Sequence, residues 1–370
     1  MNLLIVSGLF YPAKLGGPAN TLFWLSKALV SKGIKVSVVV SNHKIDEGTI
    51  QFNKWLSLTD GLRIRYCSKK TLLGLRQVFW AVREMNNSDI VMLSSICYLP
   101  NTLVYIAAII RHKKIIWSPR GELFDSAVQN SKQKRLFFSF LNSILSPKVV
   151  FHATSRQERE TVNRYLPSVN KIAVIPNYFE LPEKEGRKRQ ESPYFIYVGR
   201  INPLKALDNL LRGLAMSTRF MQSDYRLLLV GPDQASYSQV LKVLARQLGI
   251  ESRVEFLPGL YGKKKYQAYS NALFTFLVSH SENFGNVVIE SLSQGTPVVA
   301  AKGTPWECLD ESGAGFWIEN DPQSISKCVD EIMCMPLSRY NDMRVAAEDL
   351  ALSFDVNENI DSWVELLNSI

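Results

Sequence analysis

The stretch "NLLIVSGLFYPAKLGGPANTLFWLSKALVSKGIKVSVVVS", residues 2–41, decides the fold because it holds three consecutive elements of one unit. The apolar runs at 2–8 and 35–41 are typical of buried strands. Between them, leucines spaced three and four residues apart predict a helix over 19–32. Strand, helix and strand at this spacing predict a βαβ unit, and therefore a parallel sheet.

The same alternation continues along the chain and then begins again. Further strands are expected in the first half at 89–95, 113–119, 149–155 and 171–177. After a linker at 178–193 that is rich in charge, Pro and Gly, a second series is expected at 194–200, 226–232, 253–259, 273–279 and 297–303.

These runs predict an α/β fold with two Rossmann-like, doubly wound parallel-sheet domains facing an interdomain cleft. The first domain is expected over 1–176 and the second over 177–352, and a helix at 353–370 is expected to pack back onto the first domain. Ligands of such sheets bind beyond the carboxyl ends of the strands, so the site is expected there.

Composition places the chain among soluble globular proteins, with 46% hydrophobic and 21% charged residues in 370. The apolar start has neither a basic segment before it nor a small-residue cleavage site after it, so no export signal is expected. The apolar run at 103–110 is too short to span a bilayer. Five cysteines without a C-x-x-C pair indicate free thiols in the cytoplasm, and the four histidines lack metal-ligand spacing.

The net charge of +9 is unevenly distributed, because residues 1–176 carry +15 and residues 177–370 carry −6. A strongly basic half indicates an anionic partner, either a membrane surface or nucleic acid.

Two segments of the basic half read as basic amphipathic helices on an anionic membrane surface, at 131–148 and 69–83. Each could instead be an ordinary helix that faces the core. The charge of the whole half favours membrane contact at the inner face of the cytoplasmic membrane. The contact residues expected are Lys132, Lys134, Arg135, Phe137 and Phe138.

"SENFGNVVIES", residues 281–291, sets Glu282 and Glu290 either side of a turn that leads into a helix beginning near Gly285. The free amides at such a helix start, those of Gly285, Asn286 and Val287, are candidates to hold a phosphate. Two carboxylates around a phosphate suit a nucleotide sugar, one for the sugar and one for the ribose. Spacing alone allows a simpler interpretation, in which Glu282 is an acid beside the helix dipole and Glu290 a solvated charge.

"VGRINPLKALDNLLRGL" places Arg200 at a strand end and Lys205 five residues later, where two cations could neutralise a diphosphate. Taken singly, each is equally consistent with a surface ion pair. "PAKLGGPAN" supplies Gly16 and Gly17, whose amides could approach a phosphate, although such a pair is most often only a tight connection.

Four segments together give the chain a specific resemblance: "LVSHSENFGNVVIESLSQGTPVVAAKGTPW", "YVGRINPLKALDNLL", "VIPN" and "LGGPAN". In order and spacing they resemble retaining glycosyltransferase family 4, which has the GT-B fold, and the resemblance extends over essentially the whole chain. The spacing of Glu282 and Glu290 matches the E-x7-E signature of that family.

The resemblance implies that Arg200 and Lys205 bind the donor diphosphate, Glu290 the ribose hydroxyls and Glu282 the transferred sugar. It implies that Gly17, beside Gly16, covers the diphosphate. The turn residues implied in donor binding are Asn283, Phe284, Gly285, Asn286 and Val287.

The family acts without a metal, and the chain has no Asp-x-Asp motif, so no metal and no cofactor are expected. Fixed cations and the helix start would stabilise the departing nucleoside diphosphate. Family members retain the anomeric configuration, and a leaving phosphate oxygen is thought to accept the proton of the acceptor.

One segment departs from many relatives, which carry a His-containing motif where this chain reads "WSPRGELFD". The Pro-Arg-Gly form, and "GTPW" at 303–306, resemble the branch that makes bacterial surface polysaccharides such as the O-antigen of lipopolysaccharide. Arg120 is therefore a catalytic candidate that could hold a donor hydroxyl, a phosphate or the acceptor, or could be an arginine salt-bridged at a loop.

The leading hypothesis is a peripheral membrane transferase that moves a sugar from a nucleoside diphosphate sugar to a glycan linked to polyprenyl diphosphate. The alternatives are a nucleotide-sugar epimerase on the same fold, a nucleic-acid-binding protein and a catalytically silent sugar-nucleotide sensor. The sequence lacks a helix-turn-helix, an RNA-stacking motif and a zinc finger, so we expect no nucleic acid partner.

Overall fold

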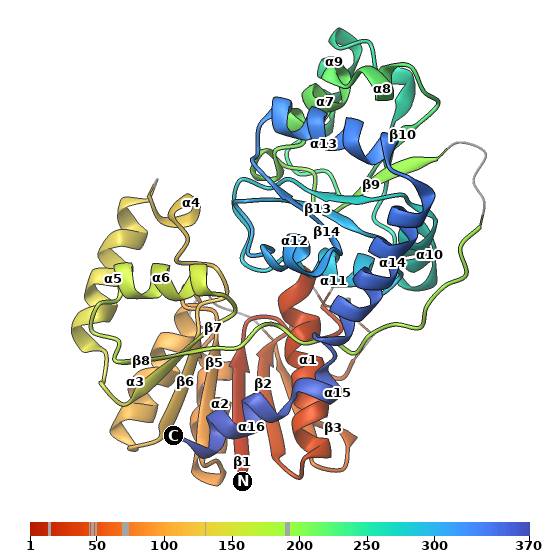
Figure 1. The fold of residues 1–370 in the computed structure, drawn as a ribbon. Coiled ribbons are helices and arrows are strands. Elements are labelled where there is room, and N and C mark those ends of the chain that lie inside the picture. Colours follow the sequence, from red (N-terminus) through yellow and green to blue (C-terminus); the bar gives the residue numbers. More distant parts are fainter. Residues whose placement is uncertain are drawn as a thin grey trace. The chain divides into compact units, whose positions relative to one another are not determined.

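A computed structural model describes residues 1–13, 16–43, 45, 48, 50–68, 74–129, 131–188 and 193–370. The chain divides into two compact units, one of Met1–Glu180 with Val356–Ile370, the other of Leu181–Asp355. The divisions fall four and three residues beyond those expected from the sequence. Figure 1 shows each unit as a sheet covered by helices.

The first unit is built on an eight-stranded sheet in the order β3-β4-β2-β1-β5-β6-β7-β8, which is parallel apart from the antiparallel pair β3 and β4. Its strands are β1 (Asn2–Ser7), β2 (Lys35–Ser41), β3 (Trp55–Thr59), β4 (Leu62–Cys67), β5 (Ile90–Ser94), β6 (Lys114–Ser118), β7 (Val149–Ala153) and β8 (Lys171–Val174). Its helices are α1 (Gly16–Ser31), α2 (Leu75–Glu84), α3 (Leu99–Ile110), α4 (Asp125–Val128), α5 (Lys132–Ile144), α6 (Arg156–Tyr165), α15 (Val356–Asn359) and α16 (Asp361–Asn368).

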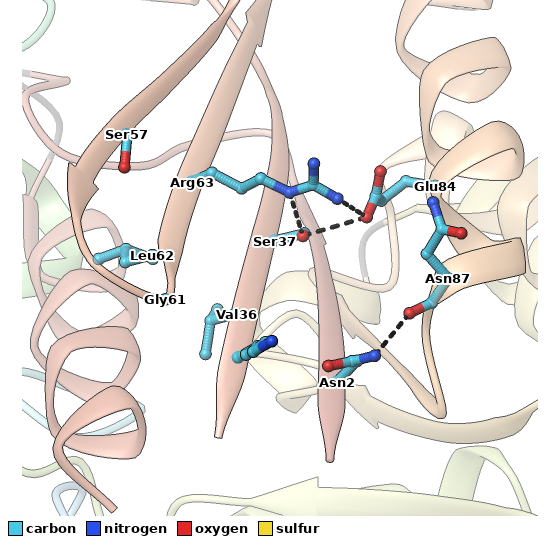
Figure 2. A pocket seen from close by; sticks show the side chains of 10 residues that line it. Asn2, Val36, Ser37, Ser57, Gly61, Leu62, Arg63, Glu84 and Asn87 are labelled. Carbon is cyan, nitrogen blue, oxygen red and sulfur yellow. Dashed lines mark hydrogen bonds and ion pairs between the residues drawn. The ribbon is translucent and has the colours of Figure 1, made fainter. Parts of the chain in front are cut away.

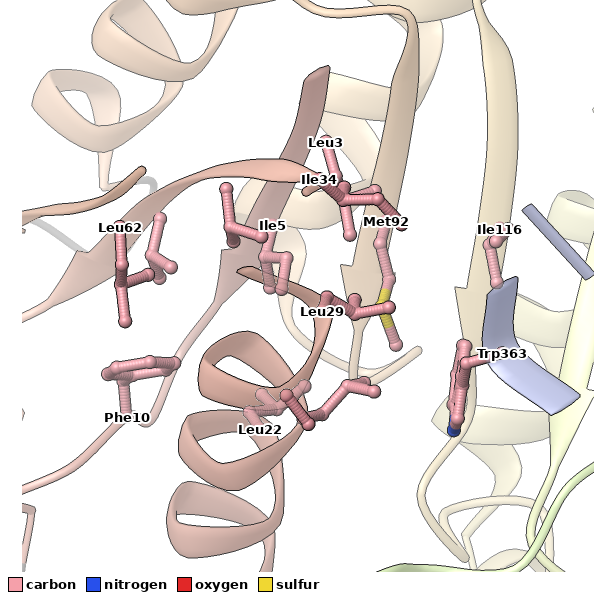
Figure 3. Packing of buried hydrophobic residues seen from close by; sticks show 14 of the residues in the cluster. Leu3, Ile5, Phe10, Leu22, Leu29, Ile34, Leu62, Met92, Ile116 and Trp363 are labelled. Carbon is pink, nitrogen blue, oxygen red and sulfur yellow. The ribbon is translucent and has the colours of Figure 1, made fainter. Parts of the chain in front are cut away.

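The strand β1 is buried on both faces, as the continuous apolar run predicts. Leu3 and Ile5 pack with α1, α15 and α16 on one face, and Leu4 and Val6 pack with α2, α3, α5 and α6 on the other. Figure 3 shows Trp363 of α16 in the same cluster as the β1 side chains. The C-terminal helix is therefore part of the first unit's core.

The second unit holds a six-stranded parallel sheet in the order β11-β10-β9-β12-β13-β14. Its strands are β9 (Tyr194–Val198), β10 (Arg226–Val230), β11 (Val254–Leu257), β12 (Thr275–Leu277), β13 (Val298–Ala301) and β14 (Gly315–Ile318). Its helices are α7 (Leu207–Met216), α8 (Thr218–Met221), α9 (Tyr237–Gln247), α10 (Gly262–Asn271), α11 (Asn286–Leu292), α12 (Cys308–Ser312), α13 (Pro322–Cys334) and α14 (Leu337–Leu352).

Three strands were not predicted from the sequence, namely β3, β4 and β14. β3 and β4 form a hairpin at the edge of the first sheet, with Asp60-Gly61 between them. An Asp-Gly pair between two short apolar runs is a hairpin signal that could have located both strands. β14 is a four-residue strand at the edge of the second sheet.

Candidate functional site

The strand order reverses in the second sheet between β9 and β12, which lie side by side although β10 and β11 separate them in sequence. Ligands of doubly wound sheets bind beyond the carboxyl ends of strands at such a point. The loop after β9 carries Arg200 and Lys205, and the loop after β12 carries Glu282 and Gly285. The two loops touch, because the amide of His280 donates to the carbonyl of Leu204 over 3.0 Å. The fold thus brings the predicted residues of both motifs together.

Lys205 and Glu282 form an ion pair in which Nζ of the lysine donates to Oε2 of the glutamate. Both side chains are largely buried. The hydroxyl of Ser279 also approaches Oε2, at 3.4 Å. The sequence predicted that Lys205 binds a diphosphate and Glu282 a sugar, whereas in this structure each neutralises the other.

Arg200 is exposed, and its carbonyl accepts a hydrogen bond from the Tyr197 hydroxyl over 2.8 Å. Among the described residues, no carboxylate lies within ion-pairing distance of its guanidinium. Arg200 therefore presents a charge that is not compensated by an ion pair within the described chain, and the surface ion pair considered from the sequence is absent there.

Gly285 precedes α11 with a φ of 83°, in the left-handed region. A Cβ at this position would lie 2.7 Å from Cδ2 of Leu277, so a side chain is excluded by both conformation and space. Asn286 and Val287 are the first two residues of α11, whose opening amides have no acceptor within the helix. The helix that was predicted to begin near Gly285 therefore begins at Asn286 in the structure.

Trp306, the last residue of the "GTPW" segment, packs against the turn before Gly285. Its indole Nε1 donates to the carbonyl of Phe284, and its ring lies 5.1 Å from the Phe284 ring and 5.4 Å from that of Phe354. Phe284 was predicted to bind the donor; its side chain is buried in this cluster, and its part in donor binding stays a prediction. Asn283, its neighbour in the turn, is partly exposed.

Glu290 lies on α11 with its side chain only 12% exposed. Nζ of Lys265 donates to Oε1 over 2.7 Å, and the hydroxyl of Tyr269 donates to Oε2 over 3.2 Å. Burial is the largest single influence on the pKa of Lys265 and lowers it. The charge and hydrogen bond of Glu290, together with Tyr266 and Tyr261, outweigh burial, so the pKa is raised overall. The interpretation of Glu290 as a solvated helix-face charge is therefore wrong.

In the first unit, Arg120 follows β6 with a φ of 59°. Its Nε donates to Oγ of Ser94 over 3.2 Å and its guanidinium donates to Oδ1 of Asn177, in the "VIPN" segment, over 2.9 Å. Burial lowers the pKa of Arg120 to about 10, against the charge of Glu158, so the side chain stays cationic at neutral pH. Among the described residues no carboxylate forms an ion pair with it, so the salt-bridged loop arginine is not what the structure shows.

Two groups close to Arg120 in the fold or the sequence were missed, the half-buried Glu122 and the buried His152. Glu122 accepts hydrogen bonds from the amides of Ile96 and Cys97 over 2.6 and 2.8 Å. Burial raises its pKa. His152 contacts the Ser118 hydroxyl through Nδ1 and the Ile175 carbonyl through Nε2, each over 2.8 Å. Burial, with the charge of Arg120, lowers its pKa to about 3, so the ring is neutral.

Gly16 and Gly17 form the first turn of α1 rather than the loop before it. The two residues that precede them, Lys14 and Leu15, lie outside the described residues. The amides of both glycines thus belong to a helix start, where the first N–H groups have no acceptor within the helix.

The helix α5 differs from prediction in its orientation about its axis. Phe138 is 1% exposed and belongs to the core, so its predicted membrane contact is wrong, and Phe137 is half-buried beside it. Lys132 and Arg135 are exposed, whereas Nζ of Lys134 donates to the carbonyl of Ala127 over 2.9 Å. The apolar side chains that face solvent are instead Leu136 and Phe140, 72% and 55% exposed.

The second predicted basic helix begins within residues that the structure does not describe, 69–73. Its described part is α2, which exposes Leu75 and Phe79. No helix in the described part of the chain is both long enough and apolar enough to cross a bilayer.

A cavity of about 250 Å³ lies elsewhere, at the amino-terminal ends of β1, β2 and β4 (Figure 2). Arg63 in its wall is already paired with Glu84 and donates to the Ser37 hydroxyl over 3.0 Å. This edge is opposite to the one where doubly wound sheets bind ligands, so it is not the candidate site.

Residues 179–349 match the family described as glycosyl transferases group 1. The matched residues lie almost entirely within the second unit, Leu181–Asp355. The chain is 34% identical over 165 residues to the D-inositol 3-phosphate glycosyltransferase of Acidothermus cellulolyticus. This alignment covers 40% of this chain and 37% of that protein. The same enzyme of Nocardia farcinica is 36% identical over 162 residues, covering 40% and 36%. The alignments thus span little more than a third of these relatives.

Solved structures match over the whole chain. The sucrose-phosphate synthase of Thermosynechococcus elongatus superposes with a TM-score of 0.78 at 17% identity, covering 100% of this chain and 98% of that one. Anabaena HepE, in complex with UDP and glucose, gives 0.74 at 18% identity, covering 100% of both chains. At such identities the likeness concerns the fold, and it confirms the predicted α/β architecture of GT-B type.

Within the second unit, the sequence singled out Arg200, Lys205, Glu282 and Glu290 but did not predict the partners of Glu290. Lys265 and the buried Tyr269 are four residues apart, a spacing that puts them on one face of a helix. Nothing in that spacing relates them to a glutamate on another helix.

Proposed function

We propose that this chain is a retaining, metal-independent glycosyltransferase that moves a sugar from a nucleoside diphosphate sugar to a lipid-linked glycan. One observation carries the proposal: the loops after β9 and β12 meet and gather Arg200, Lys205, Glu282 and the helix start at Gly285. Arg200 and Lys205 would bind the diphosphate, and the opening amides of α11 would add donors. The match to group 1 glycosyl transferases supports this assignment.

In this proposal the charge that develops on the leaving diphosphate is stabilised by fixed cations and oriented amides. Glu282 contacts the transferred sugar, and Glu290 accepts the ribose hydroxyls. The acceptor attacks from the face that the diphosphate leaves, and its proton passes to a leaving phosphate oxygen. Arg120, which is cationic and partly exposed in the first unit, would hold the acceptor or a phosphate group.

A panel of nucleoside diphosphate sugars, scored by thermal unfolding, tests the donor. A ligand at a hundred times its Kd stabilises the folded chain by about 2.7 kcal/mol. HepE was solved with UDP, so uridine donors are the first choice. Product analysis with and without acceptor then separates the alternatives: an epimerase forms a new sugar nucleotide without acceptor, and a sensor binds without turnover. Salt-sensitive binding of oligonucleotides would favour the nucleic acid alternative.

Arg200→Ala is expected to weaken the binding of UDP, or of the diphosphate that the panel selects, by about 1.5–3 kcal/mol, the range for hydrogen bonds to a charged group. Calorimetry measures this change directly. Arg212→Ala, which removes an exposed arginine of α7, is the matched control and should bind like the parent. Equal affinity of Arg200→Ala and the parent would remove the donor site from this loop.

The acceptor is proposed to be a glycan on polyprenyl diphosphate, in the synthesis of a surface polysaccharide. Support comes from the charge of the first unit, +11 over residues 1–180 and 356–370 against −2 over 181–355. The exposed side chains of α5 combine Lys132 and Arg135 with Leu136 and Phe140, which suits an anionic lipid surface. The relatives' name favours a second candidate, a phosphorylated cyclitol that requires no membrane.

The double reversal Lys132→Glu with Arg135→Glu is expected to reduce binding to vesicles that contain anionic phospholipid. Each basic residue near such a surface contributes about 1 kcal/mol, and reversal adds repulsion. Co-sedimentation measures the bound fraction. The control reverses Lys242 and Lys327, which are exposed in the second unit. If both double variants sediment like the parent, α5 does not contact the membrane.

A further inference from the structure

The helix α10 supports the carboxylate of Glu290 at both of its oxygens. Lys265 reaches Oε1 over 2.7 Å and Tyr269 reaches Oε2 over 3.2 Å. Because the two residues are one helical turn apart, a single rigid element supplies both contacts. The carboxylate is thus held at two points, which restricts both its rotamer and the plane of its oxygens.

Lys265 differs from the other lysines of α10 in its burial. Lys263 is 74% exposed and only approaches Glu185, at 3.7 Å, whereas the Lys265 side chain is 18% exposed. Its ammonium also lies 5.1 Å from the ring of Tyr266, which faces the same interior. Lys265 is therefore the lysine of the helix that turns inward, toward the carboxylate.

A largely buried ion pair adds little to the stability of the fold. Removing two charges from water costs most of what their attraction returns, and apolar side chains of similar size often serve the fold equally well. The acidic member of the pair, Glu290, is instead the fifth residue of α11, the helix that follows the turn at Gly285. The proposed function assigns this side chain to the ribose. A role in preparing that carboxylate explains its position.

We propose that Lys265 and Tyr269 are positioning residues that orient Glu290 to recognise the vicinal hydroxyls of a ribose. A carboxylate has about four lone-pair sites, and α10 occupies one on each oxygen. One site per oxygen remains, which suits a bidentate contact with two adjacent hydroxyls. The prearranged carboxylate loses little freedom when the ligand binds, and that saving appears as affinity. This inference rests on the proposed function, because it assumes that Glu290 meets a nucleoside.

The test measures the coupling between Lys265 and the ribose hydroxyls by calorimetry, with UDP and 2′,3′-dideoxy-UDP as probes. Lys265→Met is expected to weaken UDP binding about ten- to thirtyfold and to change the binding of the dideoxy compound less than threefold. Tyr269→Phe should follow the same pattern with a smaller change. In a Glu290→Gln background, Lys265→Met should have little further effect, because it acts through that carboxylate.

A structural role would not produce this pattern. Lys265→Arg, which keeps the charge, should recover a large part of the UDP affinity, and Lys264→Met, which removes an exposed neighbour, should match the parent. In turnover assays Lys265→Met should raise KM for the donor and leave kcat within about threefold. Thermal unfolding of each variant shows whether it is folded.

Two results overturn the inference and separate it from the proposed function. In the first, the parent binds UDP while Lys265→Met weakens the binding of UDP and of its dideoxy analogue equally, or weakens the binding of neither. In both cases the positioning role is wrong and the donor site stands. If Lys265→Met does not fold, Tyr269→Phe carries the same comparison between UDP and its dideoxy analogue. If the parent binds no nucleoside diphosphate at all, the proposed function fails and this inference fails with it.

Discussion

Glu282→Gln is expected to lower turnover about a hundredfold while leaving UDP affinity equal to that of the parent or raising it up to about tenfold. The loss of rate follows from removing a group aimed at the reacting sugar, since one such preorganised group supplies about 2.7–4 kcal/mol in the transition state. The sign of the change in affinity follows from the ion pair. Lys205 donates to Oε2 of Glu282 in the structure, and the neutral amide would leave its ammonium free for a diphosphate.

The two effects are separated by measuring kcat with saturating donor and the dissociation constant of UDP by calorimetry. Glu307→Gln, which neutralises an exposed acid in the same unit, is the control and should change neither quantity. A parallel loss of rate and of UDP affinity in Glu282→Gln would show that Lys205 needs its partner to bind phosphate. The competition inferred from the ion pair would then be wrong.

Trp306→Ala is expected to reduce the free energy of unfolding of the second unit by about 3–5 kcal/mol, the range for removing a buried aromatic ring. The indole is 1% exposed and fills the space between Phe284 and Phe354. Its loss leaves a cavity and removes one hydrogen bond to the Phe284 carbonyl. Since that carbonyl belongs to the turn before Gly285, weaker UDP binding should accompany the loss of stability.

Urea unfolding followed by circular dichroism measures this change, with the transitions of the two units analysed separately. Trp306→Phe keeps a ring in the cluster and removes one hydrogen bond, so it should cost about 0.5–1.5 kcal/mol, the net contribution of a typical hydrogen bond. Tyr261→Ala removes a ring that is 70% exposed and is the control. A loss below about 1 kcal/mol in Trp306→Ala would mean that the turn does not depend on this contact.

Hydrophobic periodicity along the chain predicted the positions of individual strands and helices. The run Lys35–Ser41 coincides with β2, and the helix predicted over 19–32 corresponds to α1 at Gly16–Ser31. The start of α1 was misplaced because Gly16 and Gly17 were interpreted as loop residues, although glycine is tolerated in the first turn of a helix. The phase of α5 was also misjudged, because basic and apolar residues follow one another there without showing which face is buried.

The sequence by itself determined that Arg200, Lys205, Glu282 and Gly285 lie at one edge of a parallel sheet. Each follows a strand, and the carboxyl ends of parallel strands meet at the same edge. Only the tertiary structure decided that Lys205 pairs with Glu282 and Lys265 with Glu290, across 77 and 25 residues of chain. Strand and helix periodicity arises from neighbours in sequence, whereas the pairing of charges depends on the order of the strands and the paths of the loops.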